Sequence, residues 1–171
     1  MDSMVTQDLV SVKCKPGTLD IFAYKMYHSF WCTAGIGRLI FSALFLAIGF
    51  ATIGDIDWYL TVIVLFIGML NVVVTPLLYL YQASKAANAS IPITYTFRND
   101  VIVANDGKNR VELPWSGLPL VVWMRKEMFI YTSAVEALVL PRRQMDGKDA
   151  EVLHAIETSS NPNRTVKCKV L

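Results

Sequence analysis

Histidine and cysteine, the side chains that most often carry enzyme chemistry, are few in this chain and widely separated. His28 and His154 are the only histidines, and they belong to different segments without the spacing of metal ligands. Gly35-Ile36-Gly37 opens an apolar run and lacks the lysine of a phosphate-binding loop, so packing explains these glycines better. Because no nucleophile, acid-base pair or metal set can be assembled, we expect a protein that is not an enzyme and that binds no cofactor or metal.

The three cysteines do not form a redox or metal motif either. Cys14, Cys32 and Cys168 are odd in number and too far apart for a CxxC pair. We expect free thiols, with Cys32 a lesser candidate for acylation at a membrane surface.

Five basic residues in the second half of the chain are the one set that suggests binding: Arg125, Lys126, Arg142, Arg143 and Lys148. In a small barrel, the turn between two strands and the exit of the last strand can lie at one rim. Near an anionic leaflet, each such charge contributes about 1 kcal/mol. These residues are candidates for contact with anionic lipid or a protein partner, and the alternative is an ordinary solvated positive surface.

Composition favours a membrane protein. The chain has 171 residues, 54% of them hydrophobic, and a mean hydropathy of +0.41. A net charge of +2 is too small to indicate nucleic acid as a partner. A hydrophobic hairpin of about 46 residues leaves room for one small soluble domain.

The elements that would position the basic residues are organised around residues 36–82. Trp58 to Tyr81 is a run of 24 residues without a formal charge. At about 1.5 Å per residue, it is long enough for a hydrocarbon core of about 30 Å. The first run, about residues 36–54, needs Arg38 to extend its side chain back to the headgroups. The sequence therefore predicts a two-helix transmembrane hairpin with spans at about 36–54 and 58–81.

Charge places both ends of the chain in the cytoplasm. Lysine and arginine flank the two spans, whereas the connecting loop carries Asp55 and Asp57 and no basic residue. By the positive-inside rule, the loop lies outside and both termini lie on the cytoplasmic side of the membrane.

Small and polar residues within the spans are candidates for helix–helix packing: Ser42, Ala43, Ala47, Ala51, Gly68, Asn71 and Thr75. An antiparallel hairpin centred near Ile56 sets Asn71 beside Ser42, where the two side chains can hydrogen-bond. Pro76 is expected to bend the second helix, with Thr75 covering a freed carbonyl. The same small-residue faces can pair between chains, so a homo-oligomer is also open.

The remaining segments predict a small antiparallel β-sheet or barrel with a C-terminal helix. Residues 1–35 contain a strand that ends at Cys14 and an amphipathic helix from Thr18. Residues 91–158 contain six short strand signals and then a helix from about Gly147 to Thr158, with Asp146 as its N-cap. Six strands are marginal alone, so we expect the N-terminal strand to join them. Residues 159–171 are expected to be a loose tail.

Short motifs across most of the chain resemble the bacterial YcxB-like family. The matching residues are Pro76, Trp115, Phe129-Ile130-Tyr131 and Val139-Leu140-Pro141-Arg142-Arg143. The resemblance implies a bacterial inner-membrane protein whose cytoplasmic domain is like a pleckstrin-homology (PH) domain, and it brings no established activity. The fold expected is thus a membrane α+β protein, in which a transmembrane hairpin carries a PH-like β-domain.

The function expected is non-catalytic: a membrane-anchored module whose β-domain contacts anionic membrane lipid or an unidentified protein partner. The alternative is an intramembrane accessory or regulatory subunit, such as a transporter partner or a toxin-immunity protein, in which the spans recognise the partner. Trp115, Trp123, Phe129 and Tyr131 are expected to lie in the core.

Overall fold

The computed structural model describes residues 8–30, 33–159 and 165–168. They form an α+β chain that divides into two compact units. One unit takes residues 1–20 and 89–171, from both ends of the chain, and is called the β unit here. The other takes residues 21–88 and is called the helical unit.

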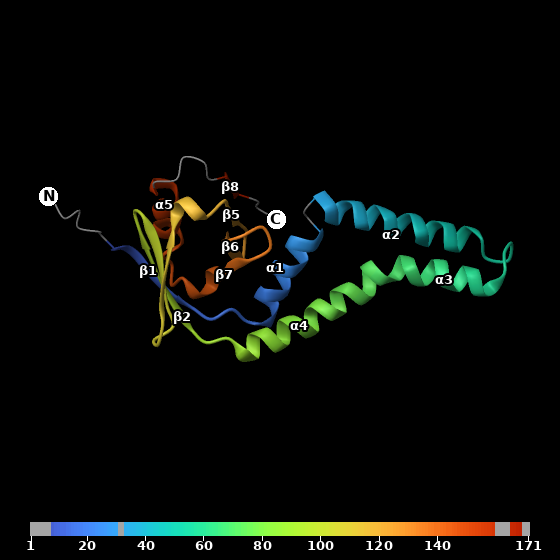
Figure 1. The fold of residues 1–171 in the computed structure, drawn as a ribbon, viewed down its shortest axis with the longest axis horizontal. Helices are drawn as coiled ribbons and strands as arrows, with labels where there is room; N and C mark the ends of the chain where they lie inside the picture. The colour runs from blue at the N-terminus through green and yellow to red at the C-terminus, as the bar shows by residue number, and fades with distance from the viewer. Residues whose placement is uncertain (1–7, 31–32, 160–164, 169–171) are drawn as a thin grey trace. The chain divides into compact units, whose positions relative to one another are not determined.

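The first sheet of the β unit has the strand order β1-β2-β3-β4 and is antiparallel throughout. Its strands are β1 (Asp8–Cys14), β2 (Ile93–Arg98), β3 (Val101–Asn105) and β4 (Arg110–Pro114). β1 pairs with β2 through Val12 opposite Tyr95, although about eighty residues separate them in the chain. The prediction that the N-terminal strand completes the sheet is confirmed (Figure 1).

The second sheet has the order β7-β6-β5-β8. Its strands are β5 (Leu120–Trp123), β6 (Glu127–Tyr131), β7 (Ala137–Pro141) and β8 (Thr165–Cys168). β8 lies parallel to β5, with Val166 opposite Val121. The expectation of a loose tail over 159–171 was therefore wrong for Thr165–Cys168, which form a strand, and the predicted antiparallel sheet contains one parallel pair. A parallel partner follows a long crossover and carries no hairpin signal.

One apolar core lies between the two sheets and α5 (Asp149–Thr158). Phe97, Ile102 and Val121 from the sheets and Ile156 from α5 are fully buried in it. Strand β2 buries alternate residues, as expected where one face meets the core.

The helix start predicted at Gly147, with Asp146 as N-cap, was wrong. Asp146 and Gly147 adopt φ angles of +52° and +78°, so the chain is still turning there. The helix begins at Asp149, and Lys148 occupies the N-cap position. Aspartate is tolerated in this left-handed conformation as well as at a cap, and the sequence does not distinguish the two uses.

Four aromatic side chains are core residues of the β unit, as predicted. Trp115, Trp123, Phe129 and Tyr131 are 1%, 8%, 0% and 4% exposed. The Trp115 indole N–H donates to the carbonyl of Arg98 at 2.8 Å, so its polar atom is satisfied inside the core.

The helical unit contains α2 (Thr33–Ala51) and α3 (Trp58–Met69), which pack side by side as a hairpin (Figure 1). A π-helix over Leu70–Val74 joins α3 to α4 (Thr75–Ala89). α1 (Thr18–Phe30) begins in the β unit and continues into this one. Within the unit, Lys25 of α1 donates to the side chain of Gln82 at 3.1 Å.

Close approach of α2 and α3 depends on glycine. A Cβ added at Gly68 would lie 2.7 Å from Leu46 Cγ and 3.0 Å from the Leu46 backbone nitrogen. A Cβ at Gly49 would lie 2.6 Å from the side chain of Leu65. Ser42, seven residues before Gly49, is 1% exposed and belongs to the same helix face. Gly68 and Ser42 were among the predicted packing residues, whereas Gly49 was not.

The alanine stripe predicted to pack in the hairpin does not do so within one chain. Ala43, Ala47 and Ala51 are exposed. The contact face of α2 contains Ser42, Leu46 and Gly49. Ala43 and Ala47 each come one position after a residue of that face, and Ala51 comes two positions after Gly49. One position rotates a side chain about 100° around the helix, so the three alanines point away from α3. The predicted Ser42–Asn71 hydrogen bond remains a prediction, because the Asn71 side chain lies outside the described part of the chain.

The second apolar helix is bent, as expected, but the bend lies between Met69 and Val72, several residues before Pro76. The axes of Trp58–Met69 and Val72–Ala89 differ by 41°. The Thr75 hydroxyl donates to the Leu70 carbonyl at 3.0 Å, five residues back. A π-helix before a proline is a recognised cause of such a bend.

Among the described residues, no single helix has both the length and the apolar composition to cross a bilayer. Two bent pairs of helices have them: Thr18–Phe30 with Gly35–Ala51, and Trp58–Met69 with Val72–Ala89.

Candidate functional site

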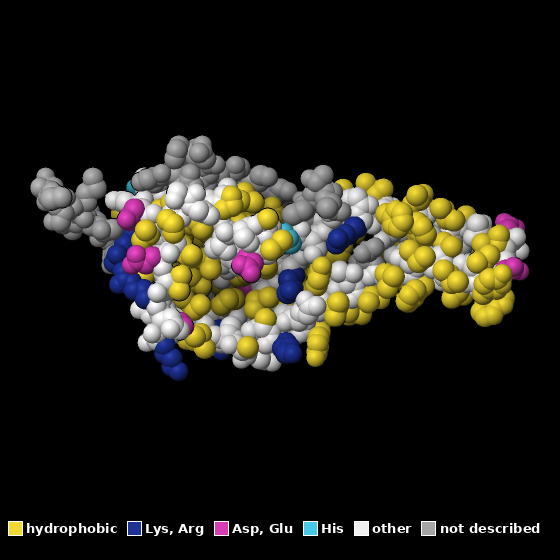
Figure 2. Space-filling model, viewed as in Figure 1, with side chains coloured by type: hydrophobic (Ala, Val, Ile, Leu, Met, Phe, Trp, Pro, Cys, Tyr) yellow, Lys and Arg dark blue, Asp and Glu magenta, His cyan; other side chains and the backbone are white. Residues whose placement is uncertain are grey.

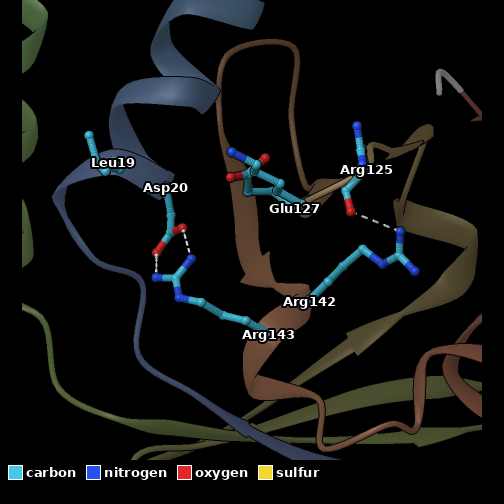
Figure 3. Close-up of a pocket in the computed structure, with 7 residues that line it drawn as sticks. Leu19, Asp20, Arg125, Glu127, Arg142 and Arg143 are labelled. Atoms are coloured by element: carbon cyan, nitrogen blue, oxygen red, sulfur yellow. Dashed lines mark hydrogen bonds and ion pairs between the residues drawn. The ribbon is translucent and has the colours of Figure 1, made fainter. Parts of the chain in front are cut away.

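A pocket of about 690 Å³ lies in the β unit, where the β5–β6 turn, the segment after β7 and the first turn of α1 meet (Figure 3). Its lining comprises Leu19, Asp20, Arg125, Lys126, Glu127, Arg142 and Arg143. Four of the five predicted basic residues therefore lie together. The fifth, Lys148, lies elsewhere and donates to the Ser11 carbonyl on β1 at 3.1 Å.

Arg143 forms the strongest ion pair of the pocket. Its two terminal nitrogens donate to the two oxygens of Asp20, both at 2.6 Å (Figure 3). Asp20 is fully buried, whereas the Arg143 side chain is 57% exposed. The hydrogen bonds to Asp20 are the main reason that the pKa of Arg143 is raised above its ordinary value.

Local structure places Asp20 at this position. It lies in the first turn of α1, where its carboxylate also accepts the backbone N–H of Gly17 at 2.7 Å. An acidic side chain that bonds back to the residue before a helix is one half of a capping box. The Asp20 carboxylate thus caps the start of α1 and also pairs with Arg143 in the pocket.

Arg142 is held from three sides. Its Nε donates to Asp149 at 3.2 Å, its Nη1 donates to the Arg125 carbonyl at 3.0 Å, and its guanidinium lies 4.8 Å from the centre of the Trp123 ring. The Arg142 backbone N–H also donates to the Lys126 carbonyl at 2.9 Å. These contacts hold the β5–β6 turn and the segment after β7 in a fixed relation.

Arg125 and Lys126 differ from the two arginines. Both side chains are exposed, and within the described residues neither makes a hydrogen bond or an ion pair. Figure 3 shows the Arg125 side chain extending away from Arg142. Their charges are available to a ligand, whereas those of Arg142 and Arg143 are partly used inside the fold.

Glu127 adds a carboxylate to the wall of the pocket. It is 9% exposed, and burial raises its pKa above the ordinary 4.5, with the nearby Asp20 adding to the shift. Lys126 and Arg143 oppose that shift. Four cationic and two acidic side chains line the pocket, so its net charge is positive and favours an anion.

Sequence reasoning missed Leu19, Asp20 and Glu127. Asp20 lies in the predicted amphipathic helix from Thr18, and nothing in the sequence links it to an arginine 123 residues away. Glu127 follows Arg125 and Lys126 in the predicted turn, and the structure places it instead as the first residue of β6.

The thiol of Cys14 was expected to be free, and it is free and buried. Burial, with smaller effects of Asp146 and Asp20, raises its pKa to about 11. Such a thiol is not a nucleophile at neutral pH. In the described part of the chain, no three histidine, cysteine or acidic side chains are placed to hold a metal ion.

No protein-family model matches the chain, and neither a curated protein nor a solved structure is significantly similar to it. The resemblance to the YcxB-like family therefore stays a prediction from short motifs.

Proposed function

We propose that this protein is a non-catalytic, membrane-anchored interaction module. The observation that carries the proposal is the exposure of large hydrophobic side chains: of the 29 exposed ones among the described residues, 24 lie between Ile36 and Tyr81 (Figure 2). Continuous apolar surface of that extent is found where a protein meets lipid or another protein. The helical unit is the anchor, and the β unit with its basic pocket is the part that binds.

The arrangement proposed for the anchor is a hairpin of bent spans with both termini in the cytoplasm of a bacterial inner membrane. Figure 2 shows acidic side chains gathered at the turn between α2 and α3, where the sequence has Asp55 and Asp57. Acidic residues in a short loop between apolar runs, with basic residues on the other flanks, fit the positive-inside rule. The PH-like character of the β unit is part of the same proposal, supported by two sheets and the helix α5 around one core.

Sedimentation tests the anchor directly. Cell membranes that contain the full chain are washed with alkaline carbonate, which removes peripheral proteins. We expect the chain to stay in the pellet and to need detergent for release. A chain found in the supernatant after lysis without detergent would overturn the proposal.

Topology has its own test. In a chain whose native cysteines are replaced by serine, Asp55→Cys and Glu151→Cys are labelled in intact cells with a maleimide that does not cross the inner membrane. We expect labelling of the first variant only, and labelling of the second after lysis. Labelling of Glu151→Cys alone in intact cells would reverse the orientation.

The second candidate is an intramembrane accessory or regulatory subunit, such as a transporter partner or a toxin-immunity protein. The exposed Ala43, Ala47 and Ala51 support it, because small residues on a lipid-facing helix allow another helix to approach closely. A photo-crosslinking residue is placed at Ala47 or at Lys126 in native membranes. Adducts formed only from Ala47 favour this candidate or a homo-oligomer, and adducts formed only from Lys126 favour the β unit.

A further inference from the structure

We propose that the pocket at the β5–β6 turn binds a phosphate group, carried either by a lipid headgroup or by a small soluble molecule. Arg125 and Lys126 supply the charges that the ligand engages, and Arg142 and Arg143 form the fixed wall behind them. The inference rests on the proposed function and deepens it by naming the ligand class.

Pre-organisation is the first argument. Backbone and side-chain hydrogen bonds from Arg142 to the Lys126 and Arg125 carbonyls, at 2.9 and 3.0 Å, hold the two basic segments together before any ligand arrives. Asp149 and the Trp123 ring keep the Arg142 guanidinium from moving. A site that is already ordered loses less conformational entropy on binding.

The uneven use of the four cations is the second argument. Arg142 and Arg143 have partners in the fold, at Asp149 and Asp20, whereas Arg125 and Lys126 have none among the described residues. Two adjacent exposed cations beside two fixed guanidinium groups provide several N–H donors at one place. Guanidinium and ammonium groups combined in this way suit phosphate, which accepts several charge-assisted hydrogen bonds.

Size and shape are the third argument. A volume of about 690 Å³ lies within the range of small-molecule sites, about 300–1,000 Å³, and exceeds the space that a bare phosphate fills. The exposed Leu19 at the edge offers an apolar contact to whatever carries the phosphate. The phosphate is therefore one end of a larger molecule.

The two carboxylates do not cancel this attraction. The charge of Asp20 is matched by two hydrogen bonds from Arg143. Of the two acids that line the pocket, Glu127 is the one with no such hydrogen bond among the described residues, and it lies near Asp20, Lys126 and Arg143. Replacing it with glutamine removes a repulsive charge from the wall and is expected to tighten phosphate binding.

The test uses the full chain in dodecyl maltoside, an uncharged detergent, with binding measured by calorimetry. One probe is glycerol 3-phosphate, a soluble phosphomonoester. The other is dihexanoyl phosphatidic acid, which carries the same group on a short lipid, with dihexanoyl phosphatidylcholine reporting partition into the micelle. Tighter binding of the phosphatidic acid, beyond that partition, identifies a lipid as the source, and equal binding identifies a free phosphate. Either result supports the phosphate site.

Two double variants separate the pocket from general positive charge. The double variant Arg125→Ala with Lys126→Ala removes the two charges that engage the ligand. We expect it to raise the Kd of both probes about tenfold or more, because the loss of one modest interaction already raises a Kd about tenfold. Lys13→Ala with Lys108→Ala removes the same charge from exposed positions outside the pocket and is expected to leave binding unchanged. Equal weakening by both pairs, or no binding to the native chain, would overturn the inference.

The phosphate-binding test and the carbonate-wash test of the anchor can fail independently. A chain that stays in carbonate-washed membranes but binds neither probe keeps the proposed anchor and loses the phosphate site. A chain that binds glycerol 3-phosphate but is released by carbonate does the reverse.

Discussion

Leucine, isoleucine, valine and phenylalanine occur throughout both units, but their surroundings differ. In the β unit, Phe97, Ile102, Phe129 and Leu140 are all fully buried. In the helical unit, side chains of the same kinds face outward, and Ile40, for example, is 66% exposed (Figure 2). One unit buries its apolar surface in itself, whereas the other presents that surface outward.

This difference shows how each unit is held together. The β unit gains stability from removing apolar surface from water. The α2–α3 pair depends on close contact at Gly49 and Gly68, which is how helices associate in lipid, where the surroundings are as apolar as the side chains. Substitutions of the same type in the two units should therefore have different effects.

Two tryptophan substitutions give the largest expected contrast. Trp115 is 1% exposed, whereas Trp58 is 78% exposed. We expect Trp115→Ala to cost about 3–5 kcal/mol of stability, because it leaves a cavity and removes the hydrogen bond to the Arg98 carbonyl. Trp58→Ala should change stability by less than about 0.5 kcal/mol. Urea-dependent pulse proteolysis of the full chain in uncharged detergent measures both, and equal losses would remove the distinction between the units.

Glycine substitutions test the helical unit in the same way. Gly68→Ala places a methyl group 3.0 Å from the Leu46 backbone nitrogen, so the helices must separate, at a cost of about 1–3 kcal/mol. Gly37→Ala is the matched control, since nothing lies within 4 Å of its added Cβ, and it should stabilise α2 by up to about 1 kcal/mol. Thermal unfolding of the helical signal by circular dichroism compares them. A destabilising Gly37→Ala or a neutral Gly68→Ala would contradict the α2–α3 contact.

The two units also differ in how far the sequence predicted them. The six strand signals predicted within residues 91–158 correspond to β2 to β7, because short apolar segments are bounded there by turn residues such as Asn-Asp-Gly or by proline. The apolar hairpin was evident from its length. Its packing face was not, because Ala43, Ala47 and Ala51 have the same spacing as a true contact stripe, and only the partner helix decides which stripe is used.

Contacts between residues far apart in the chain could not be predicted from the sequence. β8 pairs with β5 although two strands and α5 lie between them in the chain, and Arg143 donates to Asp20 across 123 residues. Local patterns predict elements but carry no information about such partners. The four basic residues of the pocket were predicted to cluster because they lie in a turn and just after a strand. The two acidic residues of the pocket, Asp20 and Glu127, were not predicted.

Glu127 tests how the β unit accommodates a charge. Because burial raises its pKa above 4.5 in the folded chain, the ionised form is penalised, and the full penalty applies above that raised pKa. Glu127→Gln should therefore raise Tm at pH 7, and the gain should shrink as the pH falls toward 4.5. Melting curves of both chains from pH 5 to 8 measure it. A gain that is constant with pH would assign the effect to packing.

The turns of the two units provide the smallest contrast. The Asp106 carboxylate accepts the backbone N–H groups of Lys108 and Asn109 at 2.8 and 2.6 Å, and these bonds lower its pKa below 3.8. Its contribution is present above pH 3.8 and is lost as the pH falls through the lowered value. We expect Asp106→Ala to lower Tm of the β unit slightly at pH 7 and not at all near pH 2.

Asp55 is the matched control, in the turn between α2 and α3, where its side chain makes no hydrogen bond within the described residues. Asp55→Ala should leave Tm unchanged at any pH, because the apolar hairpin is held by helix contact rather than by its turn. If Asp55→Ala lowers Tm as much as Asp106→Ala does, the turn stabilises the helical unit too, and the two units are closer in their physical chemistry than their exposed surfaces indicate.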